Sequence, residues 1–279
     1  MQVIRADYAG ACYGVQRALD LAMDAAREND HACTLGPLIH NPQVVDKLAA
    51  QGVDEAHSLD EVEPGETVVI RSHGVTPAVM RQVRAKTDRV IDATCPFVAR
   101  AQQGAADLAQ RDGCVIVVGE AGHPEVEGLV ATAREANAKV YTLVSPDQLP
   151  EKLYEPVGIV VQTTQRRETL QAVIDALEAR GISPELKDTI CTATRQRQDA
   201  AARLAAQVDA IVVIGGRNSS NTTRLAEICQ GACERTFHIE APDELDPAWF
   251  KGCLTVGVTA GASTPEDQIA AVERCLERL

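Results

Sequence analysis

The sequence has few aromatic residues, no excess of positive charge and no long apolar run. Phe, Trp and Tyr make up only 3% of its 279 residues, which argues against a stacking platform for single-stranded nucleic acid. The formal net charge is −13 at pH 7, whereas binding to a phosphate backbone needs clustered Lys and Arg. We therefore expect no nucleic-acid partner.

Membrane segments and export signals are also not evident. The longest apolar runs, such as residues 114–118, have the length of a strand, whereas a membrane-spanning helix needs about 20 apolar residues. Residues 1–7 contain no long apolar region of the kind that a signal peptide has. We expect a cytoplasmic protein that does not bind membranes.

The nine cysteines are an odd number. In a chain with no evident export signal, this count favours a reducing compartment, with cysteines that act as thiols or metal ligands rather than disulfides. The phosphate-binding motif Gly-x-x-x-x-Gly-Lys-Ser/Thr does not occur, so the sequence gives no support to a nucleoside triphosphatase.

Three of the cysteines mark an internal repeat. Counting 24 residues on from each of them reaches a glycine, and counting 28 residues on reaches a polar residue. The cysteines are Cys12, Cys95 and Cys191, the glycines Gly36, Gly119 and Gly215, and the polar residues His40, His123 and Ser219. Self-similarity of this kind is the signature of a repeated structural unit, so we infer one α/β unit used three times.

Apolar runs of strand length alternate with segments of helical periodicity along the chain. We expect strands near 1–6, 32–36, 67–71, 89–92, 114–118, 139–144, 158–161, 185–190, 210–214, 235–239 and 254–258. We expect helices near 13–27, 43–52, 76–86, 97–111, 128–137, 167–180, 193–207, 221–230 and 265–279. Such alternation implies mainly parallel sheets with helices on their faces.

The predicted fold is therefore α/β, with three pseudo-threefold-related domains around one centre. The domains cover residues 13–95, 96–191 and 192–279, the last completed by residues 1–12. The third repeat lacks the final strand that precedes the next cysteine in the other two. We predict that the strand at 1–6 fills this gap by pairing near 210–214 or 254–258.

Candidate binding residues follow the predicted strands. In open α/β sheets, ligands bind outside the carboxyl ends of the strands, and each repeat offers two loops there. These loops carry His40 and His73, then His123 and Thr163, then Ser219 and Ser263. None of these six positions is Lys or Arg, so we expect histidines, hydroxyls and helix N-termini to hold an anionic ligand.

Two further segments need a choice between roles. Ser219, Ser220 or Asn221 would cap the helix that they open, or would hold an anion together with its N-terminus. Glu125 is the carboxylate that we single out at a strand end as a candidate acid. Glu127 better fits a solvated position at the start of a helix, where the dipole favours negative charge.

Three cysteines that face one centre suit a 4Fe–4S cluster, one per chain, in which one iron lacks a protein ligand. That iron would act as a Lewis acid. A zinc ion held by three cysteines and water is the alternative metal site, and simple burial is the alternative for any single cysteine. We assign such packing to the other six: Cys33, Cys114, Cys229, Cys233, Cys253 and Cys275.

Four motifs carry a resemblance to a known family. They are Asp92-Ala-Thr-Cys-Pro96, Gly122-His-Pro-Glu-Val-Glu-Gly128, Asn218-Ser-Ser-Asn221 and Val258-Thr-Ala-Gly-Ala-Ser263. With these motifs the chain resembles the 4-hydroxy-3-methylbut-2-enyl diphosphate reductase family over essentially its whole length. The motif at Gly10-Ala11-Cys12 departs from it, because the family often has Phe at the middle position.

The resemblance implies a trefoil of α/β domains around an iron–sulfur cluster held by Cys12, Cys95 and Cys191. It implies that Glu125 supplies protons and that Thr163 helps to order the substrate hydroxyl. It also implies a set of residues that hold the diphosphate. These are His40, His73, His123, Ser219, Ser220, Asn221 and Ser263.

The implied reaction is a reductive dehydroxylation, the last step of the methylerythritol phosphate route to isoprenoids. Two electrons arrive singly, water leaves, and an allylic product is protonated to isopentenyl and dimethylallyl diphosphate. A cofactor of this kind carries the difficult redox chemistry, while the protein binds and orients. Ferredoxin or flavodoxin is the electron donor that the resemblance implies.

Two alternatives belong to other classes. Quinolinate synthase is similar in having three domains and three cysteines around an iron–sulfur cluster, but it is a lyase without net reduction. The His-Pro-Glu and Ser-Ser-Asn loops argue against that reading. A non-enzymatic iron–sulfur sensor or carrier is the other alternative, and turnover of the diphosphate would exclude it.

Overall fold

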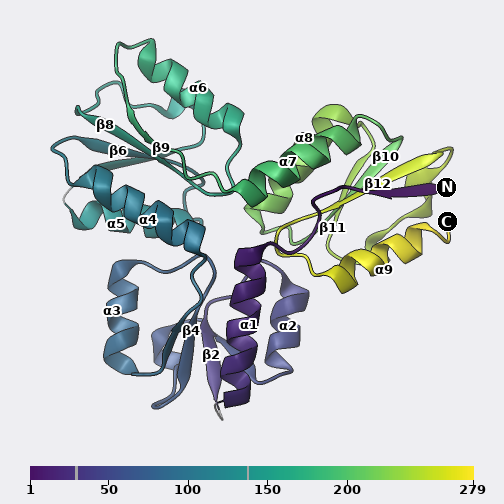
Figure 1. Ribbon diagram of the computed structural model, residues 1–279, viewed down its shortest axis with the longest axis horizontal. Helices are drawn as coiled ribbons and strands as arrows, with labels where there is room; N and C mark the ends of the chain where they lie inside the picture. The colour runs from purple at the N-terminus through teal and green to yellow at the C-terminus, as the bar shows by residue number, and fades with distance from the viewer. Residues whose placement is uncertain (29–30, 137) are drawn as a thin grey trace. The chain divides into compact units, whose positions relative to one another are not determined.

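The computed structural model describes residues 1–28, 31–136 and 138–279, which form three parallel sheets of four strands each (Figure 1). All strand pairs within these sheets are parallel. Helices follow most of the strands in sequence. The predicted α/β class with parallel sheets is confirmed.

The first sheet has the strand order β3-β2-β4-β5. Its strands are β2 (Ala32–Leu35), β3 (Val53–Ala56), β4 (Thr67–Ile70) and β5 (Val90–Asp92). The helices of this part of the sequence are α1 (Tyr13–Glu28), α2 (Pro42–Ala49), the short 3₁₀ helix η1 (Leu59–Glu61) and α3 (Pro77–Lys86).

The second sheet has the equivalent order β7-β6-β8-β9. Its strands are β6 (Cys114–Val118), β7 (Lys139–Leu143), β8 (Val157–Val161) and β9 (Glu185–Lys187). The accompanying helices are α4 (Pro96–Ala109), α5 (Pro124–Glu135), η2 (Pro146–Gln148) and α6 (Arg167–Glu178).

The third sheet repeats this order only because the N-terminus supplies its last strand. The order is β11-β10-β12-β1, with β1 (Gln2–Arg5), β10 (Ala210–Ile214), β11 (Thr236–Ile239) and β12 (Thr255–Ala260). The accompanying helices are α7 (Thr192–Ala205), α8 (Ser220–Ala232), η3 (Pro242–Glu244), η4 (Pro247–Phe250) and α9 (Glu266–Leu276). In Figure 1 the purple β1 lies beside the yellow β12, in the register Gln2 with Thr255. The predicted pairing of residues 1–6 is confirmed.

The central strands are buried on both faces, which is why they read as unbroken apolar runs. In β6, Val115 and Val117 pack in the core with α4 and α5, whereas Ile116 and Val118 pack in the core with α6. In the third sheet, β10 divides its side chains in the same way between the α7–α8 face and the α9 face. Full burial of each such side chain stabilises the fold by about 1.5–3 kcal/mol.

Several predicted boundaries were wrong, two of them at site helices. We expected α5 near 128, but it begins at Pro124, because His123 caps it and proline fits the first helical position. Likewise α8 begins at Ser220, so Ser220 and Asn221 are helical. The strand β3 and the 3₁₀ helices η1 to η4 were not predicted, and the expected helix end at residue 137 lies outside the described residues.

The described chain divides into two compact units. One unit comprises Met1–Gln16, His40–Val44 and Thr192–Leu279 and contains the third sheet; the other comprises Arg17–Ile39 and Val45–Cys191 and contains the first two sheets. The short segment from His40 groups with the third sheet because Asn41 donates to the Ser263 carbonyl at 2.8 Å and Gln43 to the Glu240 carbonyl at 3.0 Å.

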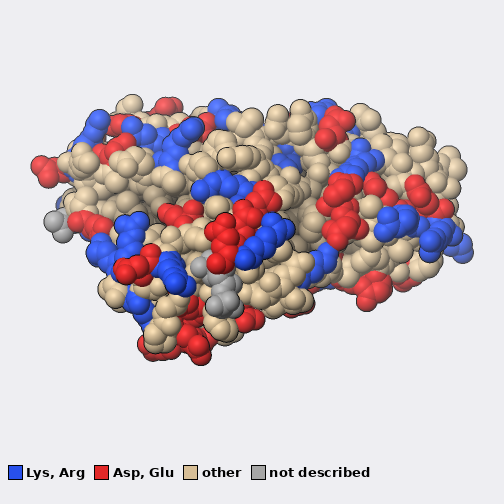
Figure 2. All heavy atoms as spheres, turned by 60° about the horizontal axis from the view of Figure 1, so that its bottom comes forward, with Lys and Arg blue, Asp and Glu red and all other residues tan. Residues whose placement is uncertain are grey.

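The surface mixes charges of both signs, as Figure 2 shows for one face. Ion pairs join some of them, for example Arg81 and Glu135 at 2.7 Å. Exposed pairs of this kind contribute about 0–1 kcal/mol each, so the buried strands dominate stability. Among the helices that the structure describes, none combines the length and hydropathy needed to cross a bilayer.

Candidate functional site

Each of the three repeat cysteines lies directly before a helix. Cys12 precedes α1, Cys95 is the N-cap residue of α4, and Cys191 precedes α7. All three are half-buried, and none of the nine cysteines, all of which are described, forms a disulfide. The N-terminus of a helix favours a negatively charged group such as a thiolate, so these positions fit cysteines that bind a metal.

One backbone hydrogen bond ties each of these cysteines to a predicted binding loop. The cysteine N–H donates to a carbonyl in the loop that follows the third strand of a sheet. The pairs are Cys12 with Ala262 at 3.1 Å, Cys95 with Ser72 at 2.9 Å, and Cys191 with Thr163 at 3.0 Å. These loops also carry Ser263, His73 and Thr163 itself, so the repeat couples a cysteine to a candidate binding residue three times.

Cys33, Cys114 and Cys229 are buried, unlike the three half-buried cysteines of the repeat. Burial, with a smaller contribution from Glu66, raises the pKa of the Cys33 thiol to about 12. Burial likewise raises the pKa of Cys229 to about 12 and that of Cys114 above its ordinary value. These thiols stay protonated and pack in the hydrophobic cores, as predicted.

Glu125 lies in the first turn of α5 and is only 2% exposed. Its carboxylate accepts two hydrogen bonds from Thr163, one from the backbone N–H at 2.6 Å and one from Oγ1 at 2.9 Å. Burial raises the pKa of Glu125 to about 7, against the opposing effect of these two bonds. Glu127 is exposed and accepts from the Gly122 N–H at 3.2 Å, as predicted.

Thr163 therefore joins the candidate acid to a cysteine loop. Its carbonyl accepts from Cys191, while its N–H and hydroxyl hold the carboxylate of Glu125. A carboxyl with a pKa near neutrality can both give and take a proton at physiological pH. Glu125, a candidate acid–base group, is thus hydrogen bonded to Thr163, the loop residue whose carbonyl accepts from the backbone N–H of Cys191.

His123 caps α5 by accepting the Glu125 N–H at Nδ1, at 3.1 Å. A ring nitrogen that accepts carries no proton, so the proton of the neutral ring lies on Nε2, which can donate to a ligand. The ring meets that of His73 edge to face, with centroids 5.5 Å apart. Two predicted binding histidines of the first two sheets are therefore brought together.

In the third repeat, the equivalent helix start has a polar group without a partner. Ser219 caps α8 by accepting the Thr222 N–H at 3.4 Å. Asn221 is 4% exposed, and neither its Nδ2 nor its Oδ1 has a hydrogen-bond partner among the described residues. Because buried amides are nearly always bonded, this one fits a position that a ligand completes.

Ser263 and His40 also come together, through the backbone of His40. Ser263 Oγ donates to the His40 carbonyl at 3.2 Å, and Asn41 Nδ2 donates to the Ser263 carbonyl at 2.8 Å and to Gln268 Oε1 at 3.0 Å. A Cβ on Gly216 would lie 2.5 Å from the His40 carbonyl oxygen, so only glycine fits there.

Sequence reasoning missed Asn41, Gly216 and Gln268, which hold this turn in place. Asn41 precedes Pro42 at the start of α2 and its Oδ1 accepts from the Val44 N–H at 3.4 Å, so a helix-capping pattern could have identified it. No spacing in the sequence pointed to Gly216 or Gln268, because their partners are distant along the chain.

The repeated glycines do have a structural role. A Cβ on Gly119 would lie 2.7 Å from Val126 Cγ2, and one on Gly215 would lie 2.7 Å from Thr222 Oγ1. Val126 and Thr222 each lie seven residues further on, near the start of α5 and α8. The glycines therefore let the first turns that carry Glu125 and Asn221 approach the strand ends.

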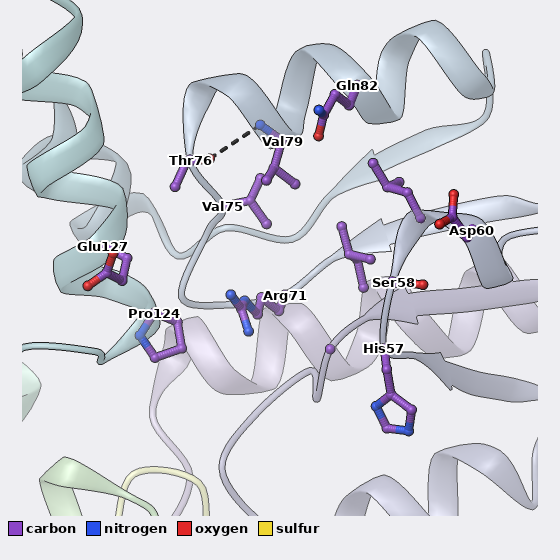
Figure 3. Close-up of a pocket in the computed structure, with 13 residues that line it drawn as sticks. His57, Ser58, Asp60, Arg71, Val75, Thr76, Val79, Gln82, Pro124 and Glu127 are labelled. Carbon is purple, nitrogen blue, oxygen red and sulfur yellow. Dashed lines mark hydrogen bonds between the residues drawn. The ribbon is translucent and has the colours of Figure 1, made fainter.

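A separate hollow of about 510 Å³ lies among the loops of the first sheet, α3 and the start of α5 (Figure 3). Arg71 lies near its middle in that view, and Asp60 and Glu127 also line it. None of the predicted site residues lines this hollow, and its charges have both signs. It therefore indicates no class of ligand and is distinct from the candidate site.

The comparisons with known proteins agree on one family. The model of the family described as LytB protein matches residues 3–277. The chain belongs to the LytB protein family. Within it, the chain is 47% identical to the 4-hydroxy-3-methylbut-2-enyl diphosphate reductase of Geobacter sp. (strain M21), over 98% of this chain and 99% of that protein.

A second relative, from Trichlorobacter lovleyi, carries the same name and is also 47% identical, over 100% of this chain and 99% of that protein. Among solved structures, (E)-4-hydroxy-3-methyl-but-2-enyl diphosphate reductase, the terminal enzyme of the non-mevalonate pathway, is similar with a TM-score of 0.72 and 40% identity, and the match covers both chains fully. The corresponding reductase of Plasmodium falciparum has a TM-score of 0.91 at 24% identity, covering 99% of this chain and 87% of that one, which supports the LytB fold.

Proposed function

We infer that this chain is a 4-hydroxy-3-methylbut-2-enyl diphosphate reductase, the terminal enzyme of the non-mevalonate pathway to isoprenoids. Relatives of that name match the chain over nearly its whole length. The geometric observation that supports this function is the buried Glu125, held by Thr163 next to the Cys191 loop. A sensor requires no such acid–base group, and the His-Pro-Glu and Ser-Ser-Asn loops argue against a lyase without net reduction.

For the cofactor, we propose a 4Fe–4S cluster held by Cys12, Cys95 and Cys191. Three half-buried thiols at helix N-termini fit this group, and the other thiols that burial keeps protonated do not. When bound, the cluster would supply electrons one at a time and a Lewis-acidic iron that has no protein ligand. Three domains, with boundaries at 13–95, 96–191 and 192–279 plus 1–12, would surround it.

The protein's own contribution is to bind a diphosphate and to deliver protons. Replacing a C–OH bond by a C–H bond consumes two electrons and two protons and releases one water. Glu125 is the proposed proton donor. A diphosphate nearby would raise the pKa of this carboxyl further, because a second negative charge disfavours ionisation. The protonated form then prevails when substrate is bound.

Thr163 has two proposed roles. Its hydroxyl hydrogen bonds to Glu125 Oε2 at 2.9 Å, so it would orient the carboxyl and pass a hydrogen bond on to the substrate hydroxyl. Its N–H holds the second carboxylate oxygen, which fixes the side chain in one rotamer. A carboxyl held in this way keeps its proton within reach of the reacting group.

The diphosphate would be held mostly by neutral donors. His123 can donate from Nε2, because its Nδ1 accepts the Glu125 N–H, and the unpartnered amide of Asn221 can donate from Nδ2. We assign the same role to His40, His73, Ser219, Ser220 and Ser263. Arg217, the nearest loop cation in the sequence, forms an ion pair with Glu244.

The decisive experiment is an anaerobic assay of purified, cluster-loaded protein with a reduced dye and 4-hydroxy-3-methylbut-2-enyl diphosphate. We expect isopentenyl and dimethylallyl diphosphate as products. Cys95→Ser should remove cluster and turnover together, whereas Cys275→Ser should keep both. A loaded protein that binds the diphosphate without reducing it would instead support the sensor. The electron donor, ferredoxin or flavodoxin, and the cytoplasmic location remain predictions from the sequence.

A further inference from the structure

Arg197 is a buried cation in the second turn of α7, the helix that follows Cys191. Its side chain is 6% exposed. Nε and Nη2 both donate to the Gly10 carbonyl, at 3.0 and 2.6 Å, and Nη1 donates to the Ala193 carbonyl at 2.9 Å. The guanidinium therefore joins the start of α7 to the loop two residues before Cys12.

The loop that Arg197 holds is fixed from its other side as well. The N–H groups of Gly10 and Cys12 donate to the carbonyls of Ala260 and Ala262, at 3.3 and 3.1 Å. Gly10 has a positive φ of 92°, and a Cβ there would lie 2.8 Å from Ile269 Cδ1. Because Arg197 also binds the Gly10 carbonyl, hydrogen bonds fix the backbone next to Cys12 from both sides.

Arg17 repeats this arrangement in the other compact unit. It lies in the second turn of α1, the helix that follows Cys12. Its Nη1 donates to the Thr94 carbonyl at 3.2 Å and its Nη2 to the Asp92 carbonyl at 3.4 Å. These carbonyls lie one and three residues before Cys95, so in both cases a helix that follows one cysteine holds the loop that precedes another.

The third position of the repeat lacks this contact. Arg100 follows Cys95 by five residues, as Arg17 follows Cys12. It is exposed and lies over the Phe97 ring at 5.6 Å, and no hydrogen bond from it to residues 185–190 is found among the described residues. The two arginine contacts are thus specific features of the Cys12 and Cys95 loops.

We propose that Arg197 and Arg17 are positioning residues for the iron–sulfur cluster, Arg197 for Cys12 and Arg17 for Cys95. This inference rests on the proposed function, in which these cysteines are ligands. A cluster tolerates little displacement of its ligand sulfurs, and residues that orient the ligands typically change metal affinity or activity by about 10–100-fold. The planar fork of arginine suits the task because it holds two acceptors in fixed directions.

The test measures two properties of anaerobically loaded wild-type and variant proteins. These are the rate of iron release to a chelator and the electron paramagnetic resonance spectrum of the reduced cluster. Arg197→Met should speed release by about 10–100-fold and alter the spectrum. Arg17→Met should have a smaller effect in the same direction, because Arg17 is less buried and its bonds are longer. Arg197→Lys keeps the charge but loses the fork, and we expect a rate between those of wild type and Arg197→Met.

Arg203→Met is the matched control. Arg203 lies on the same helix, is 57% exposed and pairs with Asp7 at 3.6 Å, so its loss should change neither the release rate nor the spectrum. If Arg197→Met does not fold, Arg197→Lys and Arg17→Met decide the matter. A wild-type rate of iron release and an unchanged spectrum in both Arg197→Lys and Arg17→Met would overturn the proposal.

Cys12→Ser distinguishes this failure from failure of the proposed function. If Cys12→Ser loses the cluster while the arginine variants behave as wild type, only the positioning role is wrong. If Cys12→Ser keeps wild-type iron content and spectrum, the ligand assignment itself fails, and the positioning role fails with it.

Discussion

Glu125 and Asn221 hold equivalent places in two repeats, yet their surroundings are opposite. Each lies two residues after the N-cap of the helix that follows the first strand of its repeat, α5 for Glu125 and α8 for Asn221. Both are buried. Glu125 has both carboxylate oxygens bonded by Thr163, whereas Asn221 has no partner for either amide atom among the described residues.

The difference separates two kinds of site residue. A group that handles protons must be held and have a pKa tuned by the protein itself, before substrate arrives. A group that only binds the ligand can lack hydrogen-bond partners until the ligand supplies them. Such a group lowers the stability of the ligand-free protein. The same repeat therefore supplies an acid in one copy and a binding group in another.

The largest expected effect comes from removing the acid. Glu125→Gln keeps the size and the hydrogen bond from the Thr163 N–H but cannot deliver a proton. Turnover should fall by about 10²–10⁴-fold, the usual contribution of one acid–base group. Single-turnover reduction at equal cluster occupancy measures it. Glu127→Gln, on the exposed side of the same helical turn, is the control, and its turnover should stay near wild type. Similar turnover in both variants would show that Glu125 is not the proton donor.

The second prediction concerns the pH dependence of stability. The pKa of Glu125 is raised from 4.5 to about 7 in the folded protein, so between these values the folded state binds more protons than the unfolded chain. Stability should therefore fall as pH rises through this window, by up to roughly 3 kcal/mol. Urea unfolding of cluster-free protein at about pH 5 and about pH 8 measures this slope. Glu125→Gln should lack this component of the slope; parallel pH profiles in the two proteins would contradict the buried, raised-pKa carboxyl.

The third prediction tests the other half of the comparison. Asn221→Leu keeps the size of the side chain and removes an amide whose burial without a partner costs about 1–3 kcal/mol. Stability of the ligand-free protein should rise, while affinity for the diphosphate substrate should fall by about tenfold or more, since each lost bond to a charged group is worth about 1.5–3 kcal/mol. Urea unfolding and isothermal titration measure the two effects.

Asn218→Leu is the control for this variant, because Asn218 is exposed in the same loop. It should leave both quantities nearly unchanged. A loss of stability in Asn221→Leu with unchanged affinity would show that Asn221 serves the fold rather than the ligand.

The smallest expected effect comes from Thr163→Val, which removes one of the two bonds to Glu125 and leaves the backbone bond. Losing a donor to the charged carboxylate should raise the pKa of Glu125 further and shift the pH profile of kcat/KM to higher pH. Turnover should drop by about tenfold, the equivalent of one modest hydrogen bond. Thr163→Ser keeps the hydroxyl and should restore the wild-type pH profile. An unchanged profile in Thr163→Val would show that the hydroxyl does not set the pKa of Glu125.

Much of the fold follows from local and periodic features of the sequence. Buried parallel strands read as apolar runs, the cysteine–glycine–polar spacing exposes the repeat, and the incomplete third repeat predicts where β1 pairs. These features are readable because strand identity depends on nearby residues and because a repeated unit must complete the same sheet each time. The four motifs then indicated the family and its candidate residues.

Tertiary structure decided what each candidate residue can do. Glu125 is buried, and its carboxylate is bonded by Thr163, 38 residues away along the chain. No spacing in the sequence shows which oxygen is bonded or how far the pKa rises. The contact of Arg197 with Gly10 joins residues 187 positions apart. Burial and hydrogen-bond partners depend on segments that meet only when the sheets form. A sequence can therefore identify candidate residues, whereas the fold determines their burial, their partners and their pKa.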